Sequence, residues 1–277
     1  MMKFLRRHLL TIYAIGVFLY LFIPVALVIL FGFNDVRGRF NFRWVGFTLD
    51  HWKSVFFGRE FGGVPGLWDA MRTSLQLAFT SSAIGTVLGT LIALALGRYQ
   101  FRGRGFTNVF LFLPMATPEV VMGSSILALF LALGFAQGYG TLLISHVVFI
   151  ISYVVLTVKA RIAGLDRHLE EAAMDLYATE WETFRRVTLP LIAPGVFAAF
   201  LLGFALSFDD FIISNFNAGP QVQTLPLWIF AANQRGIPPE ANVLGTLIFL
   251  ITVAVMLLNV VWLRRQSSKA KAADAAA

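Results

Sequence analysis

The sequence predicts an all-α membrane protein with six transmembrane helices and with both termini in the cytoplasm. Of its 277 residues, 58% are apolar and only 13% are charged, whereas about a quarter of the residues of an ordinary soluble domain are charged. A run of about 20 apolar residues is long enough to cross a bilayer as a helix, and such runs recur along this chain. These observations exclude a water-soluble enzyme as the default class.

Six apolar runs define the predicted spans and the domain limits. They are Leu9–Phe33, Thr73–Leu96, Thr107–Leu133, Thr141–Val158, Leu191–Ser214 and Val243–Leu263. The first run lacks a small-x-small cleavage site after it, so we expect a retained helix and not a signal peptide. Residues 1–8 then form a cytoplasmic N-terminus, residues 9–265 the transmembrane domain, and residues 266–277 a disordered cytoplasmic tail.

The positions of the basic residues orient the spans, because cytoplasmic loops carry an excess of Lys and Arg. With the N-terminus inside, most of the 22 basic residues fall in inside segments. They are Lys3, Arg6, Arg7, Arg98, Arg102, Arg104, Lys159, Arg161, Arg167, Arg185, Arg186, Arg264, Arg265, Lys269 and Lys271. The net charge of +7 is therefore explained by basic residues that orient the chain in membrane lipid. We predict no nucleic-acid partner.

The residue types that carry redox or metal chemistry are scarce. The chain has no cysteine and four scattered histidines, so we predict no disulfide, thiolate or metal site. His146, near the outer end of the fourth span, is expected to be a hydrogen-bonded packing residue and not a substrate ligand.

The second span carries a small residue at every fourth position. The stripe consists of Ser81, Gly85, Gly89, Ala93 and Gly97. Small residues in this pattern let another helix approach closely. Two alternatives remain at this stage: packing within the same subunit, and an interface with another subunit or a moving part.

The inside segment 159–190 is predicted to hold two short helices outside the bilayer. Its apolar residues are spaced by three and four, which is typical of an amphipathic helix; they are Ile162, Leu165, Leu169, Ala172 and Leu176. A second helix is expected to begin at Thr179, which forms a capping box with Glu182. Two helices in one loop favour a docking role, and the alternative is a helix lying passively on lipid headgroups.

Three acidic residues lie within the predicted spans, where an ionisable side chain costs roughly 2.5 to 3.5 kcal/mol and therefore usually faces a pathway. Glu119 follows two prolines in the third span, and Asp209 and Asp210 lie toward the outer end of the fifth. We expect a pathway that favours cations, with Phe208 offering an aromatic surface to an alkylammonium chain. Consecutive helical residues point about 100° apart, so only one of the two aspartates should face it. The alternatives are capping or interhelical bonding for Glu119 and headgroup-level packing for the aspartates.

One motif in the inside segment resembles that of a known family. Glu171-Ala172-Ala173, followed at the family's spacing by Val187-Thr188-Leu189-Pro190, resembles the EAA motif of ATP-binding-cassette importer permeases. Including Ser207-Phe208-Asp209-Asp210 and Asn217-Ala218-Gly219-Pro220, the chain looks most like permeases of spermidine/putrescine importers over nearly its whole length. It departs from the motif at Tyr177, where the family has glycine.

This resemblance implies the type I ABC importer permease fold in a bacterial inner membrane. It implies a non-catalytic subunit that pairs with a second homologous permease, two ATPase subunits and an external polyamine-binding protein. ATP and magnesium would bind in the ATPase, because this chain has no G-x-x-x-x-G-K-[ST] phosphate loop, and no cofactor is expected here. The residues implied in coupling to the ATPase are Glu171, Ala172, Ala173, Tyr177, Leu189 and Pro190.

The sequence leaves open the conformation at Tyr177 and the identity of the cargo, and it predicts a bend at Pro190. At Tyr177, either the helix break is displaced or the ring packs against the partner, because a tyrosine in the left-handed conformation costs on the order of 1 kcal/mol. Pro190 is expected to prevent the preceding helix from running straight on. Two alternatives to polyamine import remain: the same machinery with thiamine, ferric iron or an aminophosphonate as cargo, and, from a different class, a proton-driven secondary carrier or channel.

Overall fold

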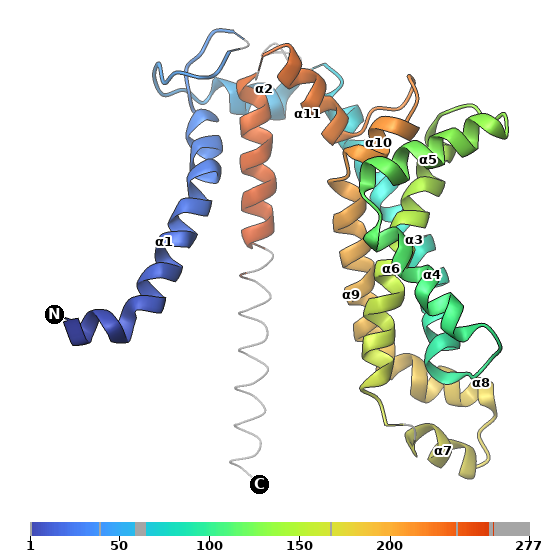
Figure 1. Ribbon diagram of the computed structural model, residues 1–277. Coiled ribbons are helices and arrows are strands. Elements are labelled where there is room, and N and C mark those ends of the chain that lie inside the picture. Colours follow the sequence, from blue (N-terminus) through green and yellow to red (C-terminus); the bar gives the residue numbers. More distant parts are fainter. Residues whose placement is uncertain are drawn as a thin grey trace. The chain divides into compact units, whose positions relative to one another are not determined.

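The computed structural model describes residues 2–38, 40–58, 65–166, 168–236, 238–254 and 257. Within these residues the chain is helical, and an isolated bridge between Asn34 and Phe47 is the sole β pairing. The labelled elements are α1 (Met2–Phe31), α2 (Asp50–Phe57), α3 (Leu67–Arg98), α4 (Arg104–Ala116), α5 (Glu119–Ala132), α6 (Tyr139–Ala163), α7 (His168–Asp175), α8 (Glu180–Thr183), the π-helical turn η2 (Phe184–Thr188), α9 (Leu189–Phe208), α10 (Ile212–Asn217) and α11 (Leu225–Gln234) (Figure 1). An apolar helix, Pro239–Ala254, follows. The all-α prediction is confirmed.

The apolar helices match five of the six predicted spans in position. Those long and apolar enough to cross a membrane are Leu9–Phe31, Leu67–Arg98, Tyr139–Ala163 and Glu180–Phe208, and the pair α4 and α5 meets the same test when taken together. The sixth predicted span is described only as far as Pro239–Ala254. Its remainder and the predicted tail at 266–277 lie outside the described residues.

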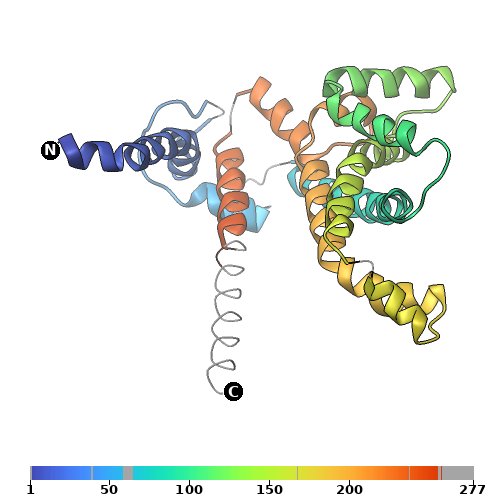
Figure 2. The same ribbon diagram turned by 60° about the horizontal axis from the view of Figure 1, so that its bottom comes forward.

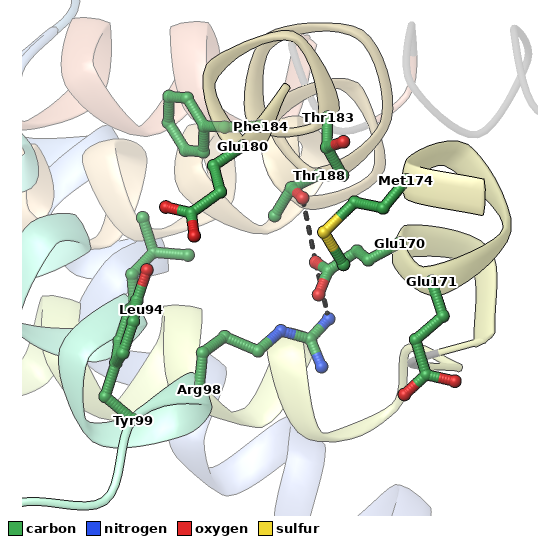
Figure 3. Close-up of a pocket in the computed structure, with 10 residues that line it drawn as sticks. All are labelled: Leu94, Arg98, Tyr99, Glu170, Glu171, Met174, Glu180, Thr183, Phe184 and Thr188. Carbon is green, nitrogen blue, oxygen red and sulfur yellow. Dashed lines mark hydrogen bonds and ion pairs between the residues drawn. The ribbon is translucent and has the colours of Figure 1, made fainter. Parts of the chain in front are cut away.

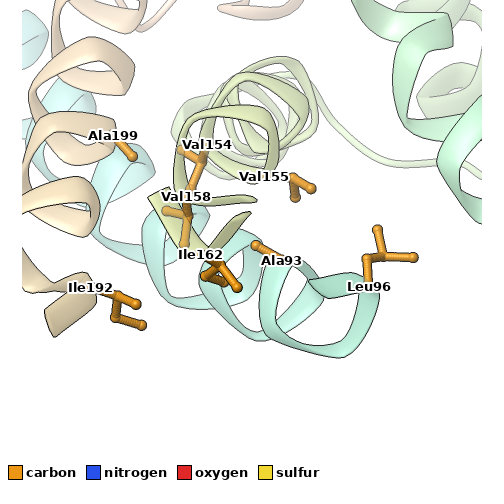
Figure 4. Close-up of a cluster of buried hydrophobic side chains, with 8 residues drawn as sticks. All are labelled: Ala93, Leu96, Val154, Val155, Val158, Ile162, Ile192 and Ala199. Atoms are coloured by element: carbon orange, nitrogen blue, oxygen red, sulfur yellow. The ribbon is translucent and has the colours of Figure 1, made fainter. Parts of the chain in front are cut away.

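The chain forms two compact units, one of residues 66–228 and one of residues 1–65 with 229–277. In the first unit α3, α6 and α9 pack against one another (Figure 2). Their contact is filled by a cluster of buried apolar side chains (Figure 4). The cluster contains Ala93, Leu96, Val154, Val155, Val158, Ile162, Ile192 and Ala199. This bundle is the rigid frame from which the extramembrane segment extends.

The small-residue stripe of α3 is the seam against α6. A Cβ placed on Gly89 would lie 2.5 Å from Val154 Cγ1 of α6. A Cβ on Gly85 or Gly97 would likewise lie 2.9 Å from a side chain of α6. Real Cβ atoms do not approach other atoms so closely, so glycine is required for this helix spacing. Of the two alternatives for the stripe, packing within the same subunit is confirmed.

The structure breaks two of the predicted spans at their acidic residues. The third span bends by 107° between α4 and α5, at Thr117, which is extended, and Pro118. Proline disfavours the helical conformation for the residue before it. The fifth span ends as α9 at Phe208, and α10 begins only at Ile212. The expectation that the two aspartates of this span lie inside a continuous helix is therefore wrong.

The inside segment also differs from its predicted pattern in two places. Ile162 belongs to the end of α6 and Leu165 to the turn that follows, so the first extramembrane helix is α7 alone. Pro190 does not interrupt the chain direction as expected: helical backbone continues from Glu180 to Phe208. The π-helical turn η2 widens the helix directly before the proline, which is a common way to accommodate a ring that blocks normal hydrogen bonding.

In the second unit, a loop after α1 is held by polar contacts. The side chain of buried Asn34 donates to Asn41 Oδ1 and to the Arg43 carbonyl, each at 2.7 Å. Further along, His51 Nδ1 of α2 lies 3.2 Å from Glu240 Oε1. This contact joins α2 to the helix Pro239–Ala254, and the hydrogen bond that Glu240 accepts raises the pKa of His51 above its ordinary value.

Candidate functional site

The predicted docking motif lies in α7, and this helix ends at Tyr177. Tyr177 has a φ of +64°, the left-handed conformation that glycine adopts most readily. Its amide donates to the Met174 carbonyl at 2.9 Å, and the Ala178 amide donates to the Ala173 carbonyl at 3.1 Å. Together these are the two bonds of a Schellman helix end. A displaced break is therefore excluded, because the helix ends at the position where the family motif has glycine.

The side chain at this helix end is fully presented to the outside. Tyr177 is 97% exposed, and Leu176 and Trp181 beside it are 81% and 67% exposed. The Trp181 ring stacks on Phe184 with centroids 5.5 Å apart. Clustered apolar surface outside the bilayer is typical of a docking site. Contact between the Tyr177 ring and a partner stays a prediction.

The second extramembrane helix begins as the sequence predicts. The Thr179 amide donates to Glu182 Oε2 at 3.1 Å, and the Glu182 amide donates to Thr179 Oγ1 at 3.3 Å, which is the capping box. The bond from the Thr179 amide holds the pKa of the Glu182 carboxyl below its ordinary value. This prediction is confirmed, and the box fixes where the chain turns back toward the bundle.

Two neighbouring glutamates of α7 have opposite surroundings (Figure 3). Glu170 Oε1 lies 3.0 Å from Arg98 Nη2, at the end of α3, and accepts a 2.8 Å hydrogen bond from Thr188 Oγ1. The Arg98 and Glu170 side chains are only 13% and 19% exposed, and partly buried ion pairs are screened less by salt than surface pairs. Glu171 is exposed. Glu170 thus ties α7 to two other elements, and Glu171 is free to meet another molecule.

Around this ion pair lies a cavity of about 330 Å³. Figure 3 shows its walls, which come from α3, α7, α8 and η2. The lining residues are Leu94, Arg98, Tyr99, Glu170, Glu171, Met174, Glu180, Thr183, Phe184 and Thr188. The cavity therefore lies between the helices that carry the predicted docking motif and the end of α3.

The remaining predicted coupling residues lie at the surface. Ala172 is exposed and Ala173 is partly exposed on α7, while Leu189 and Pro190 are exposed at the start of α9. The two alanines in the middle of α7 have short side chains, so another surface can approach the helix backbone closely. Their role in docking is untested by this geometry and stays a prediction.

The acidic residues of the spans lie at the two helix breaks. Glu119 is the first residue of α5 and is exposed; Asp209 directly follows α9 and is exposed as well. The helices that follow the two breaks, α5 and α10, pack against each other (Figure 1). Asn217 Nδ2 reinforces this contact by donating to the Gly123 carbonyl at 3.2 Å. The breaks in the two spans therefore place Glu119 and Asp209 next to the starts of two helices that pack together, α5 and α10.

Asp210, unlike its neighbour, points into the protein. It is 7% exposed and accepts hydrogen bonds from the amides of Ile213 and Ser214 at 3.2 and 2.8 Å. His146 Nε2 lies 3.4 Å from Asp210, and its Nδ1 shares a 2.7 Å hydrogen bond with Ser207. The prediction that His146 is a hydrogen-bonded packing residue is confirmed. Asp210 caps the start of α10, which leaves Asp209 as the exposed carboxylate.

Sequence reasoning missed the internal anchor formed by Glu170, Arg98 and Thr188. Arg98 counted only as one of the basic residues of the inside segments, and Glu170 was given no role. A weak signal was available, because two adjacent glutamates on a helix point about 100° apart and cannot both face the same partner. The identity of the anchoring glutamate depended on how α7 folds back on α3.

These features define a multi-pass, all-helical membrane protein. A family model described as "Binding-protein-dependent transport system inner membrane component" matches residues 85–269, and the chain belongs to this family. Over 259 residues it is 38% identical to the spermidine/putrescine transport system permease protein PotC of Escherichia coli (strain K12), covering 94% of this chain and 95% of that protein.

Two further similarities agree with this assignment. The chain is 35% identical over 238 residues to the putrescine transport system permease protein PotI of the same organism, covering 83% of this chain and 82% of that one. Among solved structures, a bacterial ABC transporter involved in the import of the acidic polysaccharide alginate matches with a TM-score of 0.67 and 17% identity, covering 95% of this chain and 98% of the other. This last likeness shows a shared fold.

Proposed function

We propose that the chain is the permease subunit of an ATP-driven importer that takes up spermidine or putrescine across a bacterial inner membrane. It has six spans with both termini in the cytoplasm, and it forms half of the pathway with a second homologous permease. Two ATPase subunits, which bind ATP and magnesium, dock on the inner face, and an external binding protein delivers the cargo. The observation that carries the proposal is the 38% identity over 94% of the chain to a spermidine/putrescine permease.

The extramembrane segment transmits the motion of the ATPase in this proposal. Glu171, Ala172, Ala173 and the ring of Tyr177 meet the ATPase, because they carry the family motif and are exposed or partly exposed on α7 and its helix end. Glu170 transfers the displacement to the bundle through Arg98 of α3 and Thr188 of η2, since a charged hydrogen bond holds its geometry better than apolar contact. Leu189 and Pro190 lead this movement into α9.

The pathway uses Asp209, Glu119 and Phe208. Asp209 and Glu119 are accessible carboxylates at helix breaks, where irregular backbone is tolerated only beside a cavity or inside protein. Phe208 stacks on Phe204 with centroids 6.0 Å apart, so its ring is held in place to contact an alkylammonium chain. Asp210, which the sequence alone grouped with these residues, instead positions the α9–α10 break.

The test is uptake of radiolabelled spermidine and putrescine in a strain that lacks this subunit. Reintroducing the wild-type chain should restore uptake. Glu171→Lys should abolish both uptake and copurification of the ATPase, because it reverses the charge that α7 presents to the ATPase. Glu170→Gln should keep the ATPase bound but uncouple its ATP hydrolysis from uptake. Asp69→Lys, an equal charge reversal at an exposed position in the first turn of α3, at the end of that helix opposite to Arg98, is the matched control and should retain the ATPase as wild type does.

Three outcomes would overturn parts of the proposal. Unchanged polyamine uptake in the deletion strain would exclude this cargo and favour thiamine, iron or an aminophosphonate. Loss of ATPase copurification in the Asp69→Lys control would exclude a specific role for Glu171. Uptake by the purified chain alone, driven by a gradient and indifferent to ATP and to Glu171→Lys, would establish a secondary carrier.

A further inference from the structure

A second cavity, of about 260 Å³, lies where α3, α4 and α6 come together. Among the described residues that line it, three are basic and none is acidic: Arg98, Arg104 and Lys159. Its apolar wall consists of Leu96, Gly97, Ile162, Ala163 and Leu165. Such a combination of converging cations and an apolar wall indicates a ligand that has both an anionic and an apolar part.

Two of the three cations have only neutral partners in the part of the chain that the structure describes. Arg104 donates from Nε and Nη2 to the Leu96 carbonyl at 3.1 and 2.8 Å. Lys159 Nζ donates to Asn108 Oδ1 at 2.6 Å. Arg98 pairs with Glu170, yet its Nε is buried without a hydrogen-bond partner. The cavity therefore carries uncompensated positive charge and at least one donor that lacks an acceptor.

The position of the cavity favours an anion of the membrane. It lies at the ends of α3 and α6, two helices long and apolar enough to span, and next to the first turn of α4, where the helix dipole favours negative charge. No residue of α4 is buried. Lys159 also lines a small neighbouring cavity between α4 and α6, whose walls include Leu111, Phe112 and Met115, so an apolar surface continues from Lys159 along α4.

We propose that this cavity binds the phosphodiester headgroup of an anionic phospholipid, whose acyl chains run along α4. Arg104 and Lys159 are fixed by their neutral partners and still have N–H groups for phosphate oxygens, and the Arg98 Nε–H supplies a third donor. A basic pocket between transmembrane helices is a recurrent kind of lipid headgroup site. The bound lipid holds the start of α4 against α3 and α6. The proposal depends on the membrane location of the chain and not on its cargo or its ATPase.

The test measures lipid binding by the purified full-length chain in detergent. Phosphatidylglycerol or phosphatidylcholine is added, and lipid retention by native mass spectrometry and the temperature of unfolding are recorded. Phosphatidylglycerol should be retained and should raise the unfolding temperature, whereas phosphatidylcholine should do neither. Lys159→Gln, which keeps a donor for Asn108, should weaken phosphatidylglycerol binding about fivefold, since one basic residue near a membrane surface contributes about 1 kcal/mol.

Controls separate this site from general lipid contact and from a free phosphate site. Arg102→Gln removes an exposed charge near the cavity that does not line it, and it should bind lipid as wild type does. Equal weakening by Arg102→Gln and Lys159→Gln, or equal retention of phosphatidylcholine, would overturn the proposal. Inorganic phosphate that displaced the lipid and stabilised the chain equally would assign the cavity to a free anion. Because Arg104 also caps α3, Lys159→Gln is the deciding variant.

Discussion

At the scale of single residues, two adjacent carboxylates can have different roles, because one side chain points into the protein and the other is exposed. Glu170 is held by Arg98 and Thr188 while Glu171 is exposed. Asp210 is buried against the start of α10 while Asp209 is exposed. In each pair the less exposed carboxylate bonds to groups within the chain, and the exposed one remains available to a ligand or a partner.

Tyr177→Gly tests whether the strained tyrosine is kept for its ring. Glycine should raise the free energy of unfolding by on the order of 1 kcal/mol, because it adopts a φ of +64° without the steric cost of a Cβ. The same variant should weaken ATPase binding, because the ring is lost. Thermal unfolding and ATPase copurification measure the two effects. Tyr177→Ala, which keeps the strain and removes the ring, should lose binding without gaining stability; a stabilised Tyr177→Gly with normal binding would contradict the docking role.

The two aspartates should separate in kinetics and in stability. Asp209→Asn should raise the KM for spermidine uptake with normal protein levels, because an accessible negative charge is removed from the pathway. Asp210→Asn should lower the free energy of unfolding by about 1 to 3 kcal/mol, because the amide group cannot satisfy both backbone donors. Uptake kinetics and thermal unfolding distinguish them, and the reverse pattern would show that Asp210 is the pathway residue.

At the scale of elements, the α3–α6 seam holds two helices together, whereas the helix breaks interrupt two spans. The seam has glycines where side chains of α6 approach, so these two spans move as one body. The breaks after α4 and α9 instead shift the following helices out of the line of their spans. In the proposed function, this close packing would let movement of α7 reach the breaks through α3 and α6.

Gly89→Ala is expected to destabilise the seam by about 1 to 3 kcal/mol, since its Cβ would lie 2.5 Å from Val154 Cγ1 and overpacking of this kind carries that cost. Gly105→Ala is the matched control, because its Cβ would meet nothing within 4 Å and alanine favours a helix. Thermal unfolding of the two variants in detergent gives the comparison. Equal stability would show that the helices separate easily, and recovery in Gly89→Ala/Val154→Ala would confirm the contact.

At the scale of the whole molecule, much of the apolar surface is left for the surroundings to cover. The apolar window of Leu9–Phe31 is 0% buried inside the chain, and that of Glu180–Phe208 is 22% buried. In water this surface would drive aggregation, but lipid or a second permease can cover it. The chain is therefore expected to work as a component of an assembly, in agreement with its family.

The sequence by itself determined the membrane class, five of the spans in position and the capping box at Thr179. These depend on local properties: apolar run length, helical periodicity and hydrogen bonds within a few residues. At Tyr177 it left two alternatives, a displaced helix break or a ring packed against the partner, and the left-handed φ of +64° excludes the first.

Only the tertiary structure decided which side chains of a pair turn inward and which helices meet. Glu170 finds Arg98 because α7 folds back beneath α3, and Asp210 finds His146 because the break in the fifth span lies beside α6. The glycine stripe likewise allowed two interfaces until the side chains of α6 filled it. Contacts between residues distant in sequence depend on how whole helices pack, and no local pattern of apolar or charged residues specifies that packing.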